Sequence, residues 1–277
     1  MQNENYIVLG MKDISFFKEK SKQIRKDIVH TAFAAQKGHI PSAFSMIEIL
    51  VMLYYQLAKI TPEMTQDRDR IILSKGHGCL GQYAILADLN FFPKEELLRF
   101  CSKEGILGGH PSRKVPGIEV STGSLGHGPS LGIGMALTNK NSNVFVIVGD
   151  GECNEGSVWE AALAANKHQL NNFWIIVDYN KYQSYDHTQV ICPLDDLKAK
   201  WQSFGFQCEE IDTINSPYSF MESFSRLQKT KGPKCIVSHS LKGLGAKALE
   251  GNLAHHHLRS MSEDFRNQLL MEIDSHA

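Results

Sequence analysis

The chain has 277 residues, and its 29 basic and 30 acidic side chains leave a formal net charge of -1. Hydrophobic residues make up 42% and charged residues 21% of the sequence, a balance that excludes a disordered or fibrous protein. No block of basic residues interrupts this near-neutral pattern, so neither nucleic acid nor an anionic membrane surface is expected as a partner.

The cysteines and the N-terminus indicate in which cellular compartment the protein is expected. Six cysteines are scattered at positions 79, 101, 153, 192, 208 and 235, without a Cys-x-x-Cys pair. This spacing favours reduced thiols over a disulfide framework or a zinc ribbon. The N-terminus lacks the basic start and apolar core of a signal peptide, and no window approaches the roughly 18 apolar residues that span a bilayer. We therefore expect a cytoplasmic protein.

The start of the chain predicts two helices. Residues 12–36 place apolar side chains at helical spacing, and Pro41 is expected to keep the chain out of helical geometry shortly after them. Ser45 and Glu48 have the spacing of a capping box, in which each side chain accepts a hydrogen bond from the other residue's backbone N–H group. This pair predicts that the second helix begins at Ser45.

The next elements surround a short strand. Residues 70–73 are predicted as a buried strand and residues 79–88 as a helix. Pro93 is expected to begin a further helix that ends at Gly105. Residues 105–134 are rich in glycine and proline but also contain His, Leu and Ile, which is typical of ordered loops that border a site rather than of a linker.

Three apolar runs in the second half predict a parallel sheet. Residues 144–148 and 173–177 are continuous runs of β-branched and aromatic side chains, separated by an Ala-rich helical segment at 157–168. Strand, helix and strand in this order form a right-handed βαβ unit. A third strand is expected over residues 235–238. The predicted fold class is therefore α/β: a single domain over residues 1–277 with a mostly parallel central sheet and helices on both faces.

Asp150 and Asn180 directly follow two of the predicted strands. In an open parallel sheet, ligands bind beyond the carboxyl ends of the strands, and carboxylate and amide oxygens are suited to Mg²⁺ or Ca²⁺. Gly149 and Gly151 allow a sharp turn and the close approach of a diphosphate. Either polar residue alone is more often a helix cap or a turn residue. Their shared position at adjacent strand ends favours a metal–diphosphate site.

Six short segments carry a further pattern, at residues 38–39, 74–78, 109–111, 122–126, 149–156 and 178–181. In this order they resemble the transketolase family of thiamine-diphosphate enzymes. The resemblance covers the chain from about residue 20, so residues 1–20 are expected to form an N-terminal extension. A full transketolase continues into pyrimidine-binding and C-terminal domains. The chain therefore looks like the N-terminal, diphosphate-binding subunit of a split transketolase.

The resemblance implies a role for each matching residue. Mg²⁺ or Ca²⁺ would be held against the cofactor diphosphate by Asp150, Asn180 and the backbone carbonyl of Tyr182. The other residues implied to bind thiamine diphosphate are His77, Gly123, Ser124, Leu125, Gly149, Gly151, Glu152 and His256. The implied catalytic residues are His39, His77, His110 and His256, around the diphosphate and the sugar hydroxyls, and Glu155 at the subunit contact.

Some of these residues have competing interpretations. A lone histidine in a loop is more often solvated or bonded to the backbone, and the run 255–257 leaves the register of His256 open. Three adjacent histidines rarely converge on one ion, so a metal site is not expected there. Cys153 has no His or Asn partner at a spacing that indicates a nucleophile. Residues 126–128 do not follow a central strand, which argues against a dinucleotide fingerprint.

The implied activity is that of a transketolase-type transferase. With a separate pyrimidine-binding C-terminal subunit, in an α2β2 assembly, the chain would transfer a two-carbon ketol unit from a ketose, phosphorylated in this interpretation, to an aldose. The catalytic glutamate is expected in that partner. Pro41, Ser42, His127 and His255 depart from the family pattern, which leaves the donor and acceptor sugars open. Two alternatives also remain: the α-type subunit of another thiamine-diphosphate enzyme, such as a 2-oxo-acid dehydrogenase, and a non-catalytic relic of the fold.

Overall fold

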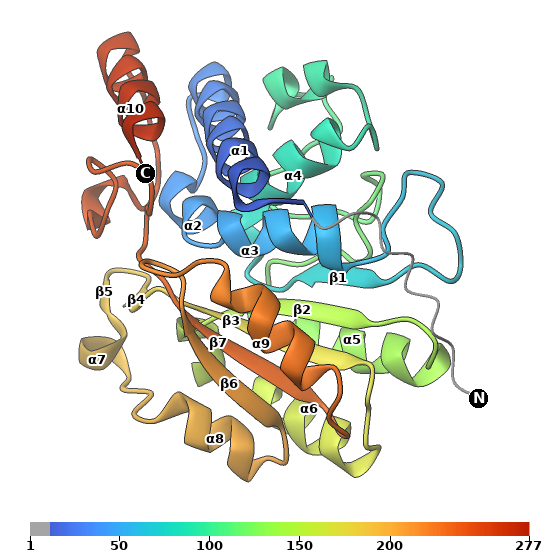
Figure 1. Ribbon diagram of the computed structural model, residues 1–277. Helices are drawn as coiled ribbons and strands as arrows, with labels where there is room; N and C mark the ends of the chain where they lie inside the picture. Colours follow the sequence, from blue (N-terminus) through green and yellow to red (C-terminus); the bar gives the residue numbers. More distant parts are fainter. Residues whose placement is uncertain (1–11, 277) are drawn as a thin grey trace.

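A five-stranded parallel sheet forms the centre of the computed structural model, which describes residues 12–276 (Figure 1). The strand order is β1-β2-β3-β7-β6. The strands are β1 (Arg70–Leu73), β2 (Val144–Gly149), β3 (Phe173–Tyr179), β6 (Gln207–Asp212) and β7 (Lys234–His239). A short antiparallel hairpin of β4 (Tyr182–Gln183) and β5 (Asp186–His187) lies outside this sheet. The predicted parallel α/β sheet is confirmed.

Helices cover both faces of the sheet, so the side chains of each strand alternate between two hydrophobic cores. On β2, Phe145 and Ile147 belong to the first core, whereas Val146 and Val148 belong to the second. The first core involves α1 (Ile14–Ala35), α2 (Ile40–Phe44), α3 (Ile47–Met52), α4 (Cys79–Asp88), α9 (Ser219–Leu227) and α10 (Glu263–Ser275). The second involves α5 (His127–Thr138), α6 (Gly156–Lys167) and α8 (Leu197–Ser203), while α7 (Thr188–Ile191) follows β5. Burial on both faces explains the continuous apolar runs.

Pro41 lies in the first turn of a helix, although it was expected to keep the chain out of helical geometry. Helix α1 ends one residue before Gln36, which adopts a left-handed conformation with φ of 52°. Helix α2 starts one residue before Pro41. Proline suits a first helical turn because no intrahelical acceptor is available there for a backbone N–H group.

The predicted capping box at Ser45 and Glu48 is wrong. The Ser45 hydroxyl donates a hydrogen bond to Asp178, at 2.6 Å, and Glu48 forms an ion pair with Arg25, at 2.7 Å. Both side chains therefore make long-range contacts instead of capping a helix. Leaving the buried Arg25 or Asp178 without its partner would cost more free energy than leaving a helix end uncapped.

The segment after β1 also differs from the expectation. The helix expected from Pro93 to Gly105 is a short 3₁₀ turn over Lys94–Arg99. Helix α5 begins inside the segment that was expected to consist of loops. A Cβ atom at Gly132 of this helix would lie 2.7 Å from Val146, so glycine allows α5 to approach the sheet closely.

Two further expectations concern the ends of the chain and membranes. Residues 1–11, which make up most of the expected N-terminal extension, lie outside the described residues, and helix α1 occupies the chain from Ile14 on. Within residues 12–276, no helix combines the length and apolar character needed to cross a membrane.

Candidate functional site

The carboxyl ends of four parallel strands border a cavity of about 440 Å³. Lys75, Asp150, Asn180 and Lys242 reach it from the loops after β1, β2, β3 and β7. Ser124 is exposed and does not line this cavity. All the other residues that the sequence assigned to the site do: His39, His77, His110, Gly123, Leu125, Gly149, Asp150, Gly151, Glu152, Glu155, Asn180, Tyr182 and His256.

Asp150 and Asn180 lie close together because their strands are neighbours in the sheet. The carboxylate of Asp150 is only 1% exposed and accepts hydrogen bonds from the backbone N–H groups of Gly151, at 2.8 Å, and Lys181, at 2.6 Å. The amide oxygen of Asn180 accepts one from the N–H group of Tyr182, at 3.1 Å. Both oxygens keep further lone pairs for an ion.

Asp178 organises the floor of the cavity, although the sequence assigned it no role. This carboxylate is fully buried and forms an ion pair with Lys75. It also accepts hydrogen bonds from the hydroxyl groups of Ser45 and Ser240 and from the amide of Asn180, at 3.0 Å. Burial alone would raise the pKa of Asp178, but Lys75 and the hydroxyl donors hold it below its usual value. Because its amide nitrogen is bound to Asp178, Asn180 has a fixed orientation.

The environment of Asp150 fits a bound cation. Burial, and then the charge of Asp178, raise the pKa of Asp150 to about 7. A divalent cation would favour the charged carboxylate and compensate both effects. No group of three or more His, Cys, Asp or Glu side chains within residues 12–276 is arranged to hold a metal ion. An ion at Asp150 would therefore depend on the Asn180 amide, backbone carbonyls and an external anion.

Glu152 holds the glycine-rich loops together. Its buried carboxylate accepts hydrogen bonds from the Ser74 hydroxyl and from the N–H groups of Gly126, at 2.8 Å, and Gly149, at 3.1 Å. Burial raises its pKa despite these donors. Glu152 thus links the loops after β1 and β2 to the start of helix α5.

Histidines from distant parts of the chain meet on one side of the cavity. The ring centroid of His39 lies 4.5 Å from that of His257, 5.7 Å from those of His77 and His256, and 6.4 Å from that of His110. Burial lowers the pKa of His39 to about 4 and that of His256 to about 3, and it lowers the pKa of His77 well below its usual value. These three imidazoles are therefore neutral near pH 7, so each can donate one hydrogen bond and accept another.

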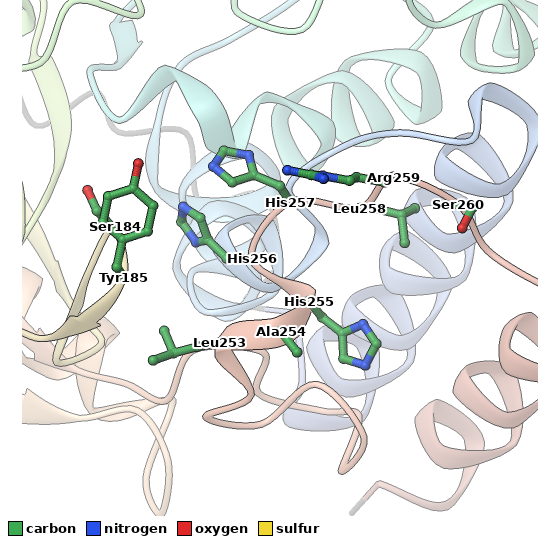
Figure 2. A pocket seen from close by; sticks show the side chains of 10 residues that line it. All are labelled: Ser184, Tyr185, Leu253, Ala254, His255, His256, His257, Leu258, Arg259 and Ser260. Carbon is green, nitrogen blue, oxygen red and sulfur yellow. The ribbon is translucent and has the colours of Figure 1, made fainter.

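The run 255–257 separates into two orientations (Figure 2). His256 and His257 both line the cavity, whereas His255 stacks on Phe265 with a centroid distance of 4.7 Å. The Nδ1 atom of His256 is buried and has no hydrogen-bond partner within the described part of the chain. His256 is therefore in place to bind a polar ligand group, with His257 next to it.

Lys242 adds a buried positive charge that no described carboxylate contacts directly, although Asp150 and Asp178 attract it from a distance. Its side chain is 3% exposed and forms no hydrogen bond or ion pair with another described residue. Burial, and then the charge of Lys75, lower the pKa of Lys242 to about 8. Burying an unpaired ammonium group is costly, and a bound anion would remove that cost. The cavity therefore combines hard ligands for a cation with a buried positive charge for an anion.

Two glycines shape the wall of the cavity. Gly123 has a φ of +144°, and a Cβ atom there would lie 3.0 Å from the ring of His110. A Cβ atom at Gly151 would lie 2.7 Å from the side chain of Gln183. A side chain at either position would displace these neighbours. With glycine, the backbone stays accessible to a ligand at both positions.

Several lining residues were not assigned to the site from the sequence. They are Ser42, Lys75, Gln183, Ser184, Lys242 and His257. Lys75 lies inside one of the recognised segments. Its ion pair with Asp178 links the loop after β1 to β3, and the local sequence does not indicate this contact. Lys242 could have been found from its position just after a predicted strand. Cys153 is buried, and burial raises its pKa well above its usual value, so it is not an activated thiol.

Comparisons with known proteins point to one family. The sequence matches the family model described as transketolase, thiamine diphosphate binding domain, over residues 18–268. It is 35% identical over 245 residues to one of the subunits of apulose-4-phosphate transketolase from Phocaeicola vulgatus, a match that covers 86% of this chain and 87% of that protein. It is 38% identical over 235 residues to a 6-deoxy-6-sulfo-D-fructose transketolase subunit of a Clostridium species, which covers 82% and 85%.

A solved structure shows the same arrangement of strands and helices. The transketolase of Pichia stipitis in complex with sedoheptulose 7-phosphate has a TM-score of 0.85 at 26% identity, covering 94% of this chain and 41% of that one. The chain thus spans less than half of that transketolase. The matched range contains the complete cavity, from His39 to His257. The chain belongs to the transketolase family and matches its thiamine diphosphate-binding domain.

Proposed function

We propose that this chain binds thiamine diphosphate together with Mg²⁺ at the carboxyl edge of its sheet. Asp150, Asn180 and the backbone carbonyl of Tyr182 hold the cation, and Lys242 pairs with the diphosphate. The observation that carries this proposal is the combination of a buried carboxylate, a fixed amide oxygen and an unpaired lysine around one cavity. Gly123 and Leu125 line the same cavity and leave room for the rest of the cofactor.

The proposed reaction is the transfer of a two-carbon ketol unit from a ketose to an aldose. The bound cofactor supplies the chemistry of carbon–carbon bond cleavage and formation. The protein's own part is to orient the sugar: the neutral imidazoles of His39, His77 and His256 can each accept and donate hydrogen bonds to hydroxyl groups. His110 lines the same cavity and completes this group.

A separate partner chain is part of the proposal. Helices α5 and α6 begin at the cavity, and their outer surfaces expose Leu131 (43%), Leu137 (39%) and Leu163 (59%). Glu155 lies at the start of α6 and lines the cavity. An apolar surface next to an open site is suited to bind the pyrimidine-binding subunit. Relatives named as transketolase subunits support this assignment, and we propose an α2β2 assembly.

The names of the same relatives support a proposal for the substrates. One is named for apulose 4-phosphate and another for 6-deoxy-6-sulfo-D-fructose. We propose that this enzyme also acts on a sugar that carries a terminal anionic group. The six cysteines are unpaired, as expected for a reducing compartment, and we propose the cytoplasm as the location.

Calorimetric titration of thiamine diphosphate with Mg²⁺ into the chain, co-purified with its partner, tests the cofactor site. The Asp150→Asn variant should lower the cofactor affinity at least about tenfold, because it removes the charge that holds the cation. The matched control is Asp195→Asn, at an exposed aspartate outside the cavity. Absence of cofactor binding to the wild-type complex, or equal affinity in both variants, would contradict the proposal.

Co-purification of the two chains tests the partner surface. Leu131→Asp and Leu163→Asp should each weaken the complex, since a charge would be buried at the contact. Met271→Asp, on the 66% exposed side chain of Met271 in α10, serves as the control. A complex that tolerates all three substitutions equally would place the partner elsewhere.

A further inference from the structure

A second cavity, separate from the candidate cofactor site, lies beyond the carboxyl end of β6. Of the five strands in the described sheet, β6 is the one whose following loop does not reach the cofactor site. The second cavity has a volume of about 470 Å³, and no residue lines both cavities. Its walls are α1, the loop of residues 213–218, Glu48, Leu244 and His276, which follows α10; α1 and α10 lie side by side (Figure 1). In open parallel sheets, the carboxyl ends of strands are the usual place for ligands.

One face of α1 carries positive charges that line this cavity. Lys18, Ser21, Lys22 and Arg25 all line it, because their spacing of three and four residues puts them on the same side of the helix. Lys18 forms no hydrogen bond or ion pair with any residue in the range 12–276. Lys22 donates one hydrogen bond, to the backbone carbonyl oxygen of Asp274, at 3.1 Å. Like charges four residues apart on a helix repel, so this face of α1 favours a bound anion.

Arg25 is buried at the base of the same cavity. It is 1% exposed, and its two terminal nitrogens bind the two carboxylate oxygens of Glu48, at 2.7 and 2.9 Å. The Nε atom of Arg25 has no hydrogen-bond partner in the described part of the chain. Among the described residues that line the cavity, Glu48 is the one carboxylate. Three cationic side chains therefore face a single carboxylate that is already paired, and the cavity keeps an excess of positive charge.

Neutral donors lie next to these charges. The hydroxyl groups of Ser21, which is 4% exposed, and of Ser216 both lack a hydrogen-bond partner within residues 12–276. Burial, and then the charge of Arg25, lower the pKa of His276, so its imidazole is neutral near pH 7 and can donate one hydrogen bond. The apolar part of the wall consists of Ile214, Pro217, Tyr218 and Leu244.

We propose that this second cavity binds a phosphate group, either as free phosphate or as part of a small organic phosphate. Lys18 and Lys22 supply the charge, and the hydroxyl groups of Ser21 and Ser216 donate further hydrogen bonds. A phosphate dianion suits this set because its oxygens accept several charge-assisted hydrogen bonds at once. The bound anion also removes the repulsion between the two lysines. A volume of about 470 Å³ leaves room for an organic group against the apolar wall.

Calorimetric titration into the full chain at low ionic strength tests this inference. The probes are inorganic phosphate, glycerol 3-phosphate and glycerol. At least one of the two phosphates should bind with a dissociation constant below about 1 mM, and glycerol should not bind. Stronger binding of glycerol 3-phosphate identifies an organic phosphate as the ligand, whereas equal or stronger binding of inorganic phosphate shows that the phosphate group alone is recognised.

Substitutions on α1 assign the binding to the second cavity. Lys18→Gln and Lys22→Gln should each weaken phosphate binding about tenfold, because each removes a charge-assisted hydrogen bond, whereas Lys22→Arg should keep most of the affinity. The matched control is Lys140→Gln, at an exposed lysine between α5 and β2 that does not line this cavity, and it should have no effect.

A further variant separates this cavity from the candidate cofactor site, where Lys242 could also attract phosphate. Lys242→Met should retain the binding that depends on Lys22. Phosphate binding that is lost in Lys242→Met and unchanged in Lys18→Gln and Lys22→Gln would overturn the second site. So would binding too weak to reach about 1 mM, or equal losses in Lys22→Gln and Lys140→Gln. The cofactor site is tested separately by thiamine diphosphate, so the two proposals can fail independently.

Discussion

Replacing Lys75 by Met removes one partner of the buried ion pair that lies beneath the candidate cofactor site. Lys75 is 1% exposed and Asp178 is fully buried, so neither charge can be hydrated in place of its partner. After the substitution, Asp178 keeps hydrogen bonds from Ser45, Ser240 and Asn180 but loses its ion pair. Breaking a buried pair in this way typically lowers the free energy of unfolding by about 3–5 kcal/mol.

Urea unfolding followed by circular dichroism measures this loss. Asp178→Asn should have a comparable effect, because it leaves Lys75 buried without a counter-ion. The double variant should lose less than the sum of the two single losses, since the second substitution removes a charge that has become uncompensated. Single losses below about 1 kcal/mol, or strictly additive losses, would show that the pair does not stabilise the folded chain.

Three further outcomes are expected. Lys242→Met should raise the free energy of unfolding without cofactor, because burial and the charge of Lys75 outweigh the attraction of Asp150 and Asp178 for the Lys242 charge. The same variant should weaken thiamine diphosphate binding in calorimetry, and a less stable variant would contradict this reasoning. The folded pKa values of His39 and His256, about 4 and about 3, lie below the usual 6.5, so the unfolded chain binds more protons below pH 6.5. The free energy of unfolding should therefore fall from pH 6.5 toward 4, and His256→Gln should reduce this fall; an unchanged slope would refute the assignment. Gly245→Ala should cost about 1–3 kcal/mol in urea unfolding, since φ is +100° and the new Cβ atom would lie 2.6 Å from buried Arg25, whereas Gly134→Ala, with open space around it, should not destabilise.

The central strands could be predicted because burial on both faces leaves a continuous apolar run. β2 and β3 are of this kind. β6 was not predicted: it lies at the edge of the sheet, and its Glu209 and Glu210 give it the charge of a surface segment. Helix α5 was not predicted because its glycines, which suggest a loop, serve instead to bring the helix close to the sheet. Contacts with distant segments determine both β6 and α5, and a local sequence pattern does not show such contacts.

The metal-ligand candidates could be found because they follow strands directly, and strand order alone places them together. Asp150 and Asn180 are the clearest examples. The role of Asp178 could not be derived in this way, since its partners Lys75 and Ser240 come from distant loops. His39 and His257 meet beside an isolated backbone bridge between Gly38 and Leu258, and nothing in the local sequence indicates this pairing.

In the bridge between Gly38 and Leu258, the N–H group of Leu258 donates to the carbonyl oxygen of Gly38 at 3.0 Å. This bridge has a consequence for the order in which the protein folds during its synthesis. Its two segments are far apart in the sequence, so they can pair only after everything between them has left the ribosome. The sheet and the loops around Asp150 can form earlier, once β7 has been synthesised. A growing chain therefore brings Asp150 and Asn180 together before it unites His39 with His257. The histidine side of the cavity is therefore completed last.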